Sequence, residues 1–346
     1  MSKRFETIDI VKGITILLVV AGHAGVPSEI NDFFRNFRMP LFFLVTGFLF
    51  SAYKFENVSN LINNRFWTLI VPYVTAGIFT FFFLFSLSFL GRDKPLLTEH
   101  IKGIAIGNGE YLSNIPLWFL TCLFSTQIIF YIFMKSIQST TVFFQWIIVF
   151  TLGTIGVFLG EIQHLPWGID VALVAQPFLF MGYKLKDLKV LEKNWKIFSL
   201  SFISIFLIFL ISVNLNSLID MNNRVYGNII LFYIGGFTGS ILVIKFCELM
   251  ISFRSTVRFL TYIGKESLVI LTFHMQFSFT VVVILYDLIF GEFPAWYTIF
   301  TLGVTICILV SVITGKFPYL NIIIKGKKPD LKRLSSSMLS FKQNVN

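Results

Sequence analysis

Residues 9–23, DIVKGITILLVVAGH, decide the fold, because they place an acid, a cation and an imidazole in one apolar segment. Charged side chains are costly in hydrocarbon, about 2.5 to 3.5 kcal/mol for Lys or Asp at the centre of a membrane helix. Lys12 and His23 are eleven residues apart. On a helix of about 3.6 residues per turn they therefore share one face, about 16 Å from each other. Polar groups kept at this cost predict a functional site inside a membrane helix.

The composition extends this interpretation to the whole chain. Of its 346 residues, 55% are hydrophobic and 13% are charged, which is far from the make-up of a soluble domain. Apolar stretches long enough to span a bilayer recur along the sequence. We therefore predict an all-α integral membrane protein, a bundle of about ten transmembrane helices. The predicted spans are 8–26, 37–53, 66–90, 115–134, 142–160, 168–183, 197–213, 228–251, 267–290 and 295–314.

The positive charges predict the orientation of the chain. With the N-terminus inside the cell, the only Lys and Arg residues in outer loops are Arg35, Arg38, Arg92, Lys94, Lys102 and Arg224, out of 28 in the sequence. This bias follows the positive-inside rule, and an even number of spans then places both termini in the cytoplasm. We expect a multi-pass protein of the plasma or inner membrane.

The predicted membrane domain covers residues 1–324, and a basic cytoplasmic tail over 325–346 is expected to be disordered. The tail is rich in Lys, Arg and Ser without apolar periodicity, which favours contact with anionic membrane lipids. The net charge of +10 is therefore a signal of topology and lipid contact. Nucleic acid is not an expected partner, because no basic stripe carries base-stacking aromatic residues. No metal is expected either, since the cysteines lie far apart in apolar runs.

Further motifs follow residues 9–23 in a fixed order. They are FRMPLFFLVTGF at 37–48, Arg65 before VPY at 71–73, PLWFL at 116–120, PFLFMGY at 177–183, and GKES at 264–267 before His274. Together they resemble the acyltransferase family 3 membrane proteins over almost the whole chain. Residues 166–172, PWGIDVA, most resemble the branch related to fucose 4-O-acetylases. The resemblance implies transfer of an acetyl group from acetyl-CoA to a sugar hydroxyl of a surface or exported glycan, or of its lipid-linked precursor.

One position departs from the family pattern. Family members commonly have Arg eleven residues before the histidine, where this chain has Lys12. Lysine keeps the positive charge but lacks the planar fork that binds phosphate through two hydrogen bonds. We therefore expect Lys12 to supply positive charge on the donor path without clamping a phosphate directly.

Acetyl transfer to an alcohol requires a base or a covalent carrier, and stabilisation of an oxyanion. His23 is the best candidate for the catalytic base or carrier, because imidazole titrates near neutral pH. A lone membrane histidine can instead serve as a hydrogen bond between packed helices. Asp9 is the second catalytic candidate, expected to orient Lys12 or pair with it; a simple interfacial ion pair is the alternative.

Two further cations are candidates for donor binding. Arg65 enters the third predicted span and suits a phosphate of CoA, although a cation there also anchors a helix at the membrane surface. Lys265, next to Glu266, resembles a cytoplasmic rim residue of the family.

Acceptor-binding candidates gather at the predicted outer surface. Trp118 lies at the start of a span, and Glu161, Trp167 and Asp170 fall in one outer region. Aromatic faces and carboxylates suit a sugar, but an interfacial aromatic belt with solvated acids has the same composition. His274 lies in the middle of a span, where we expect it to support the core through a hydrogen bond; a second catalytic role is the alternative.

A secondary transporter or a lipid-linked glycan exporter is the alternative function. Such proteins also have about ten spans and buried polar groups. Transporters tend to carry interrupted helices in corresponding halves of the chain, whereas the ionisable groups here are concentrated in the first helix. The pattern therefore favours the enzyme.

Overall fold

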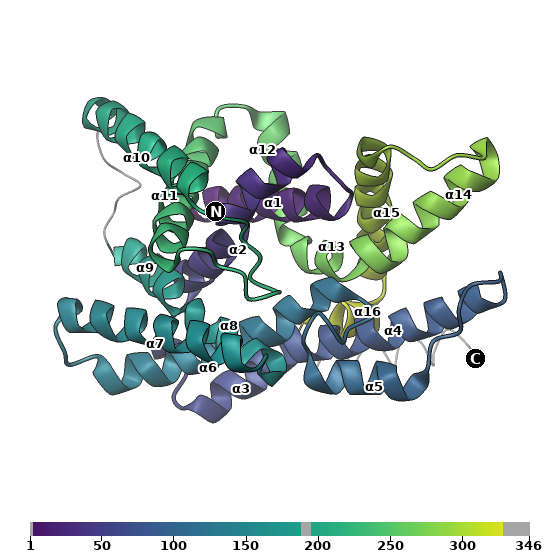
Figure 1. The fold of residues 1–346 in the computed structure, drawn as a ribbon, viewed down its shortest axis with the longest axis horizontal. Helices are drawn as coiled ribbons and strands as arrows, with labels where there is room; N and C mark the ends of the chain where they lie inside the picture. The colour runs from purple at the N-terminus through teal and green to yellow at the C-terminus, as the bar shows by residue number, and fades with distance from the viewer. Residues whose placement is uncertain (1–2, 188–194, 328–346) are drawn as a thin grey trace, which may run out of the picture.

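The computed structural model describes residues 3–187 and 195–327, and the regular elements of these residues are all helices, with no β-strand (Figure 1). Short 3-10 and π-helical turns, labelled η, link or extend the α-helices. The helices are α1 (Lys3–His23), α2 (Ser28–Leu49), η1 (Ala52–Lys54), α3 (Val58–Arg65), η2 (Phe66–Ile70), α4 (Val71–Ser88), α5 (Leu97–Ile106), η3 (Ile115–Leu117), α6 (Trp118–Ile137), α7 (Val142–Ile162), η4 (Pro166–Gly168), α8 (Ile169–Val174), α9 (Gln176–Asp187), α10 (Trp195–Leu215), α11 (Ile229–Met250), α12 (Arg254–Lys265), α13 (Ser267–Phe273), η6 (His274–Phe279), α14 (Thr280–Phe290), α15 (Trp296–Lys316) and α16 (Pro318–Ile323).

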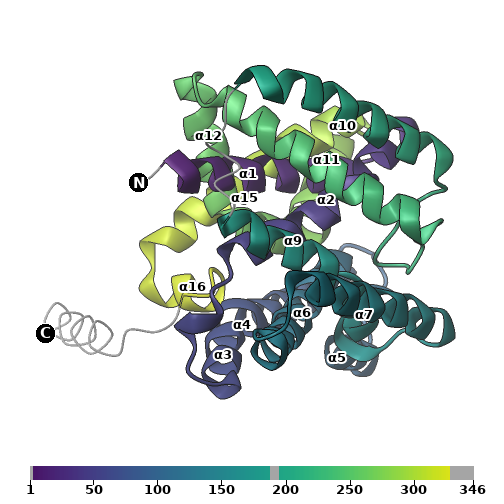
Figure 2. The same ribbon diagram turned by 90° about the vertical axis from the view of Figure 1, so that its left-hand side faces the viewer.

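Helix α1 lies inside the bundle, in contact with α2, α11, α12, α13 and α15 (Figures 1 and 2). Its crossing with α12 depends on two glycines. A Cβ at Gly13 would collide with the carbonyl of Leu260, and a Cβ at Gly264 would collide with the carbonyl of Asp9. Small residues allow membrane helices to approach this closely. The contact therefore fixes which face of α1 is turned toward the interior.

Many large apolar side chains are exposed, and many polar ones are buried. On α7, Phe143 is 71% exposed and Phe158 is 62% exposed, whereas Thr126, Gln176 and Asp170 are fully buried. A soluble protein would show the reverse arrangement. Buried polar groups and an apolar exterior indicate a multi-pass membrane protein.

Six helices among the described residues are long and apolar enough to cross a bilayer. They are Val58–Ser88, Ile115–Ile137, Val142–Ile162, Ile229–Met250, Ser267–Phe290 and Trp296–Lys316. The structure thus supports six of the roughly ten predicted spans. Helices α1 and α2, at 21 and 22 residues, are also long enough at about 1.5 Å per residue to cross a core of about 30 Å. They carry charged residues that lower their hydropathy.

Two predicted boundaries were wrong. Helix α2 begins at Ser28, nine residues before the predicted start at 37, because its first turns are polar and read as a loop. Glu29 lies in its first turn, where an acid is favourable near the helix N-terminus. The span predicted at 168–183 is divided at Ala175 into the short helices α8 and α9.

The predicted tail begins with packed residues. Lys325 Nζ lies 2.9 Å from a carboxylate oxygen of Glu266, at the start of α13. Residues 325–327 therefore belong to the folded domain. The rest of the predicted tail, 328–346, lies outside the described residues.

Candidate functional site

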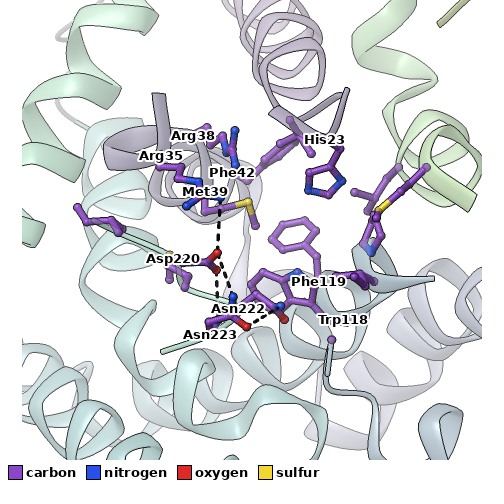
Figure 3. A pocket seen from close by; sticks show the side chains of 18 of the residues that line it. His23, Arg35, Arg38, Met39, Phe42, Trp118, Phe119, Asp220, Asn222 and Asn223 are labelled. Carbon is purple, nitrogen blue, oxygen red and sulfur yellow. Dashed lines mark hydrogen bonds and ion pairs between the residues drawn. The ribbon is translucent and has the colours of Figure 1, made fainter. Parts of the chain in front are cut away.

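A cavity of about 340 Å³ opens beside the last turn of α1 (Figure 3). His23 and Val19 line it from α1, and Trp118 and Phe119 line it from α6. Across the cavity from His23 lie Asp220, Asn222 and Asn223, and Met221 of the same segment also lines the cavity. The remaining lining residues are Arg35, Arg38, Met39, Phe42, Gly109, Glu110, Ile115, Pro116, Ile219, Leu271 and Met275.

His23 forms a hydrogen-bonded pair with His274, which lies 251 positions later in the chain. His274 is fully buried at the first position of the π-helical turn η6, and π-helical turns are frequent at functional sites. Its Nδ1 lies 2.8 Å from the carbonyl oxygen of Ile270 and 3.0 Å from that of Leu271. Its Nε2 lies 3.1 Å from Nδ1 of His23.

These contacts assign the tautomers of both rings. A carbonyl oxygen only accepts, so Nδ1 of His274 carries the proton and donates it to Ile270. In the neutral ring Nε2 of His274 is then an acceptor, and Nδ1 of His23 donates to it. Nε2 of His23 is left with a free lone pair. This is the arrangement of a general base oriented by a neighbour.

A second cavity of about 190 Å³ lies further along the same face of α1. Lys12 and Ile16 line it, together with Thr46 of α2 and Ser267 of α13. The other lining residues are Phe42, Val45, Leu49, Leu69, Phe119, Leu120, Leu123, Leu268 and Leu271. The eleven-residue spacing predicted one common face for Lys12 and His23, and both cavities lie along that face.

Three side chains border both cavities and separate them. They are Phe42 of α2, Phe119 of α6 and Leu271 of α13. The rings of Phe42 and Phe119 are packed with their centroids 5.4 Å apart. We call these three residues the partition. The two cavities are thus consecutive chambers, one beside Lys12 and one beside His23.

The wall opposite His23 is a tight turn, and a buried ion pair on the side away from the cavity holds it in place. An antiparallel bridge joins Asp220 to Val225, and Arg224 between them has a φ of 57°. Nε and Nη2 of Arg224 donate to the two carboxylate oxygens of Asp170, at 2.6 and 3.1 Å. Both side chains are buried, at 4% and 0% exposed. This bidentate ion pair fixes the turn that carries Asp220, Asn222 and Asn223 into the cavity.

A family model described as an acyltransferase domain matches residues 5–314. The chain belongs to acyltransferase family 3. The match covers both cavities and every element around them, and it favours an enzyme over the transporter alternative. Comparisons with curated proteins and with solved structures gave no match.

In this acyltransferase the donor-side candidates lie apart from His23. Asp9 Oδ1 is 3.5 Å from Lys12 Nζ, so Asp9 contacts the cation beside the second cavity and not the histidine. Arg65 lies 5.6 Å from the ring of Phe55 and donates to Asn64 at 3.2 Å. Lys265 is exposed at the end of α12. Neither Arg65 nor Lys265 lines either cavity.

Of the four acceptor-side candidates, Trp118 lines the His23 cavity. Glu161 is exposed at the end of α7, and Trp167 donates from Nε1 to the carbonyl of Ala105 at 2.9 Å. Asp170 is held by Arg224, so its carboxylate supports the cavity wall from behind. The structure therefore brings one of the four to the cavity.

Sequence reasoning missed several residues of the His23 cavity. Arg38 lies in the motif at 37–48. Its positive charge next to an apolar membrane segment is the sequence feature that could have identified it. Asp220, Asn222 and Asn223 gave no signal, because they lie in a short polar stretch between two helices. Their place opposite His23 depends on the contact between Arg224 and Asp170.

Replacing His274 with phenylalanine is expected to slow acyl transfer, because Nδ1 of His23 loses its acceptor and the imidazole ring of His23 loses its orientation. A hydrogen bond to a charged group, as His23 is once protonated, is worth about 1.5 to 3 kcal/mol, which corresponds to roughly 10- to 150-fold in rate. His274→Gln keeps an acceptor oxygen and should retain more activity. Steady-state kinetics and a pH–rate profile check this. Equal loss in both variants with an unshifted profile would mean that His274 only fills space.

Proposed function

We propose that this protein is a membrane O-acetyltransferase that moves an acetyl group from acetyl-CoA to a sugar hydroxyl of a surface or exported glycan, or of its lipid-linked precursor. The observation that carries the proposal is the free Nε2 of His23 at a cavity that meets a second chamber at one thin partition. Acetyl transfer requires the thioester and the sugar hydroxyl to meet near one base, each held in its own place. The two chambers supply these two places.

The chamber beside Lys12 suits the donor. Its lining is mainly apolar, with Lys12, Thr46 and Ser267 as polar exceptions. At about 190 Å³ it is small for a nucleotide but suits the extended pantetheine arm. Lys12 supplies positive charge along the path, and Arg65 and Lys265 are proposed to hold the phosphates outside it. The thioester then reaches the partition.

The chamber beside His23 suits a sugar. Trp118 offers an aromatic face, and Asp220, Asn222 and Asn223 offer acceptors and donors for hydroxyl groups. Pockets of this kind combine apolar surface with a few placed polar groups. Glu161 and Trp167 remain candidates for a longer acceptor that extends past the cavity mouth.

The residues in place support a direct transfer. Nε2 of His23 takes the proton of the sugar hydroxyl, and the hydroxyl oxygen bonds to the carbonyl carbon of the thioester. When the tetrahedral intermediate collapses, the C–S bond breaks. The leaving thiolate of CoA takes the proton back from His23, so the enzyme returns to its starting state.

The orientation in the membrane is part of the proposal. The distribution of Lys and Arg supports an orientation with both termini and the Lys12 end in the cytoplasm and the His23 cavity toward the outside. In a bacterial cell this corresponds to the inner membrane. Acetyl-CoA is then supplied from the cytoplasm.

The test measures both products. Membranes with and without the protein are given acetyl-CoA and a crude glycan extract, and free CoA and glycan-bound acetyl ester are quantified. Equal amounts of both products that depend on the protein and on intact His23 are expected. Release of CoA without ester formation on any glycan would contradict a sugar acceptor.

Replacing Lys12 with methionine is expected to raise the KM for acetyl-CoA about tenfold, the equivalent of about 1.4 kcal/mol of lost donor binding. Lys12→Arg keeps the charge and should retain most of the activity. Initial rates across donor and acceptor concentrations separate the two substrates. A rise only in the KM for the acceptor would contradict the assignment of Lys12 to donor binding.

A further inference from the structure

Arg38 of α2 is a buried cation in the wall of the His23 cavity, and no carboxylate among the described residues forms an ion pair with it. It is 7% exposed and lines the same cavity as His23 (Figure 3). The nearby acids Asp32 and Asp220 instead contact Arg35, at 3.9 Å each. An unpaired buried charge is strongly unfavourable. Buried charges without a partner cluster at functional sites, where a negative group can arrive during the reaction.

Among the described residues, the hydrogen bonds of the Arg38 side chain involve only one of its nitrogen atoms, Nη1. Its Nη1 donates to the side-chain oxygen of Asn31 at 2.6 Å and lies 3.4 Å from the carbonyl of Leu18. Nε and Nη2 have no acceptor among the described residues. The guanidinium is therefore fixed in place and keeps N–H groups free for a ligand in the cavity.

Arg38 also lies against the last turn of α1, the turn that ends in His23. Gly22 precedes His23, and a Cβ at Gly22 would collide with Nη1 of Arg38 and crowd the oxygen of Asn31. The guanidinium thus packs against the backbone of the turn that carries His23. Only glycine at position 22 allows this approach.

We propose that Arg38 is a catalytic residue that stabilises the oxyanion of acetyl transfer, an inference that rests on the proposed function. When the sugar oxygen bonds to the carbonyl carbon, the electron pair of the C=O double bond moves onto the carbonyl oxygen. Arg38 holds that oxygen through its free N–H groups. The pair returns when the intermediate collapses and the C–S bond breaks, and the CoA thiolate takes the proton from His23.

The missing counterion favours an oxyanion over a permanent ligand. The negative charge on the oxyanion exists only during the reaction, so an unpaired Arg38 stabilises the transition state more than the ground state. A permanent anion on the acceptor would instead neutralise Arg38 on binding. The two cases differ in which kinetic constant depends on Arg38.

The experiment compares Arg38→Met and Arg38→Lys with the control Arg92→Met, which removes an exposed arginine from an outer loop. Two rates are measured: kcat at saturating acetyl-CoA and acceptor, and hydrolysis of acetyl-CoA without acceptor, which passes through the same oxyanion. Removing one oxyanion donor typically costs about 10²- to 10³-fold. We expect Arg38→Met to lower both rates by about this factor, Arg38→Lys to lie between, and Arg92→Met to match the wild type.

A kcat for Arg38→Met that recovers at saturating acceptor would overturn the proposal and assign Arg38 to an anionic group of the acceptor. If hydrolysis is too slow to measure, kcat at saturation alone decides. Gly22→Ala gives a second test should Arg38→Met fold poorly, since it displaces the guanidinium without removing it; wild-type kcat in that variant would also overturn the proposal. Wild-type membranes that release no CoA under any condition would instead contradict the proposed function itself.

Discussion

Replacing His23 with alanine is expected to lower acetyl transfer by about 10²- to 10⁴-fold, the usual contribution of a general base. The structure leaves Nε2 of His23 as the free basic nitrogen of the pair with His274. Without it the sugar hydroxyl must react with its proton in place. The rate of ester formation at saturating substrates is the quantity to measure.

The fold should survive this change. The variant loses one interhelical hydrogen bond, and such bonds in membrane proteins average about 0.6 kcal/mol. His100→Ala is a matched control, because His100 is also buried but contacts the carbonyl of Gly77 at 2.9 Å and Ser113 at 3.1 Å, away from both cavities. We expect His100→Ala to lower the thermal unfolding midpoint more than His23→Ala and to leave kcat nearly unchanged. Normal transfer by His23→Ala would remove His23 from the chemistry.

The sequence predicted that Lys12 and His23 share one face of α1, and this prediction could be made because it depends on local geometry alone. The spacing of Lys12 and His23 fixes their relative direction on any helix, and both cavities lie along it. The role of His274 could not be assigned in the same way, since its contact with His23 joins segments 251 positions apart. A single sequence does not show which face of a distant helix it meets.

Arg38 was missed for a different reason. Hydropathy placed the start of the second span at 37, so Arg35 fell in the outer loop, and Arg38, one residue inside the predicted boundary, was counted with the loop. The helix begins at Ser28, and Arg35 and Arg38, which follow its polar first turns, line the cavity. A window that averages hydropathy separates polar from apolar turns, but it does not separate a loop from the polar end of a helix.

Asp170 illustrates the limit for acceptor residues. Its carboxylate near a predicted outer surface suits sugar binding, and its partner Arg224 is 54 positions away. Whether an acid faces a ligand or a buried arginine depends on tertiary contacts. The pair supports the cavity wall, and Asp220 on the supported turn faces the cavity in its place.

Acetyl transfer across the membrane is expected to be complete within one protein: acetyl-CoA supplied on the Lys12 side should acetylate an acceptor supplied on the His23 side. His23 lies about 22 Å along α1 from Ile8, at about 1.5 Å per residue, which is past the middle of a core about 30 Å thick. The two chambers follow each other along this length. The pantetheine arm would fill the chamber beside Lys12 and deliver the thioester to the partition.

Sealed vesicles of known protein orientation test this arrangement. Acetyl-CoA is placed on one face and a water-soluble glycan on the other, and the acetyl ester is measured over time. Transfer should occur for one orientation only, and detergent should abolish the difference between the two. Vesicles with His23→Ala report the acetyl ester that forms without catalysis by the protein.

The partition gives this experiment an internal check. Phe42, Phe119 and Leu271 separate the chambers in the structure, so the thioester reaches His23 only when these side chains move aside. Phe119→Trp adds bulk between the chambers and should slow transfer across the membrane, whereas it leaves the Lys12 end of the donor chamber unchanged. Activity found only when both substrates share the Lys12 face would contradict the split arrangement, because the sugar would then have to enter through the donor chamber, whose lining is mainly apolar.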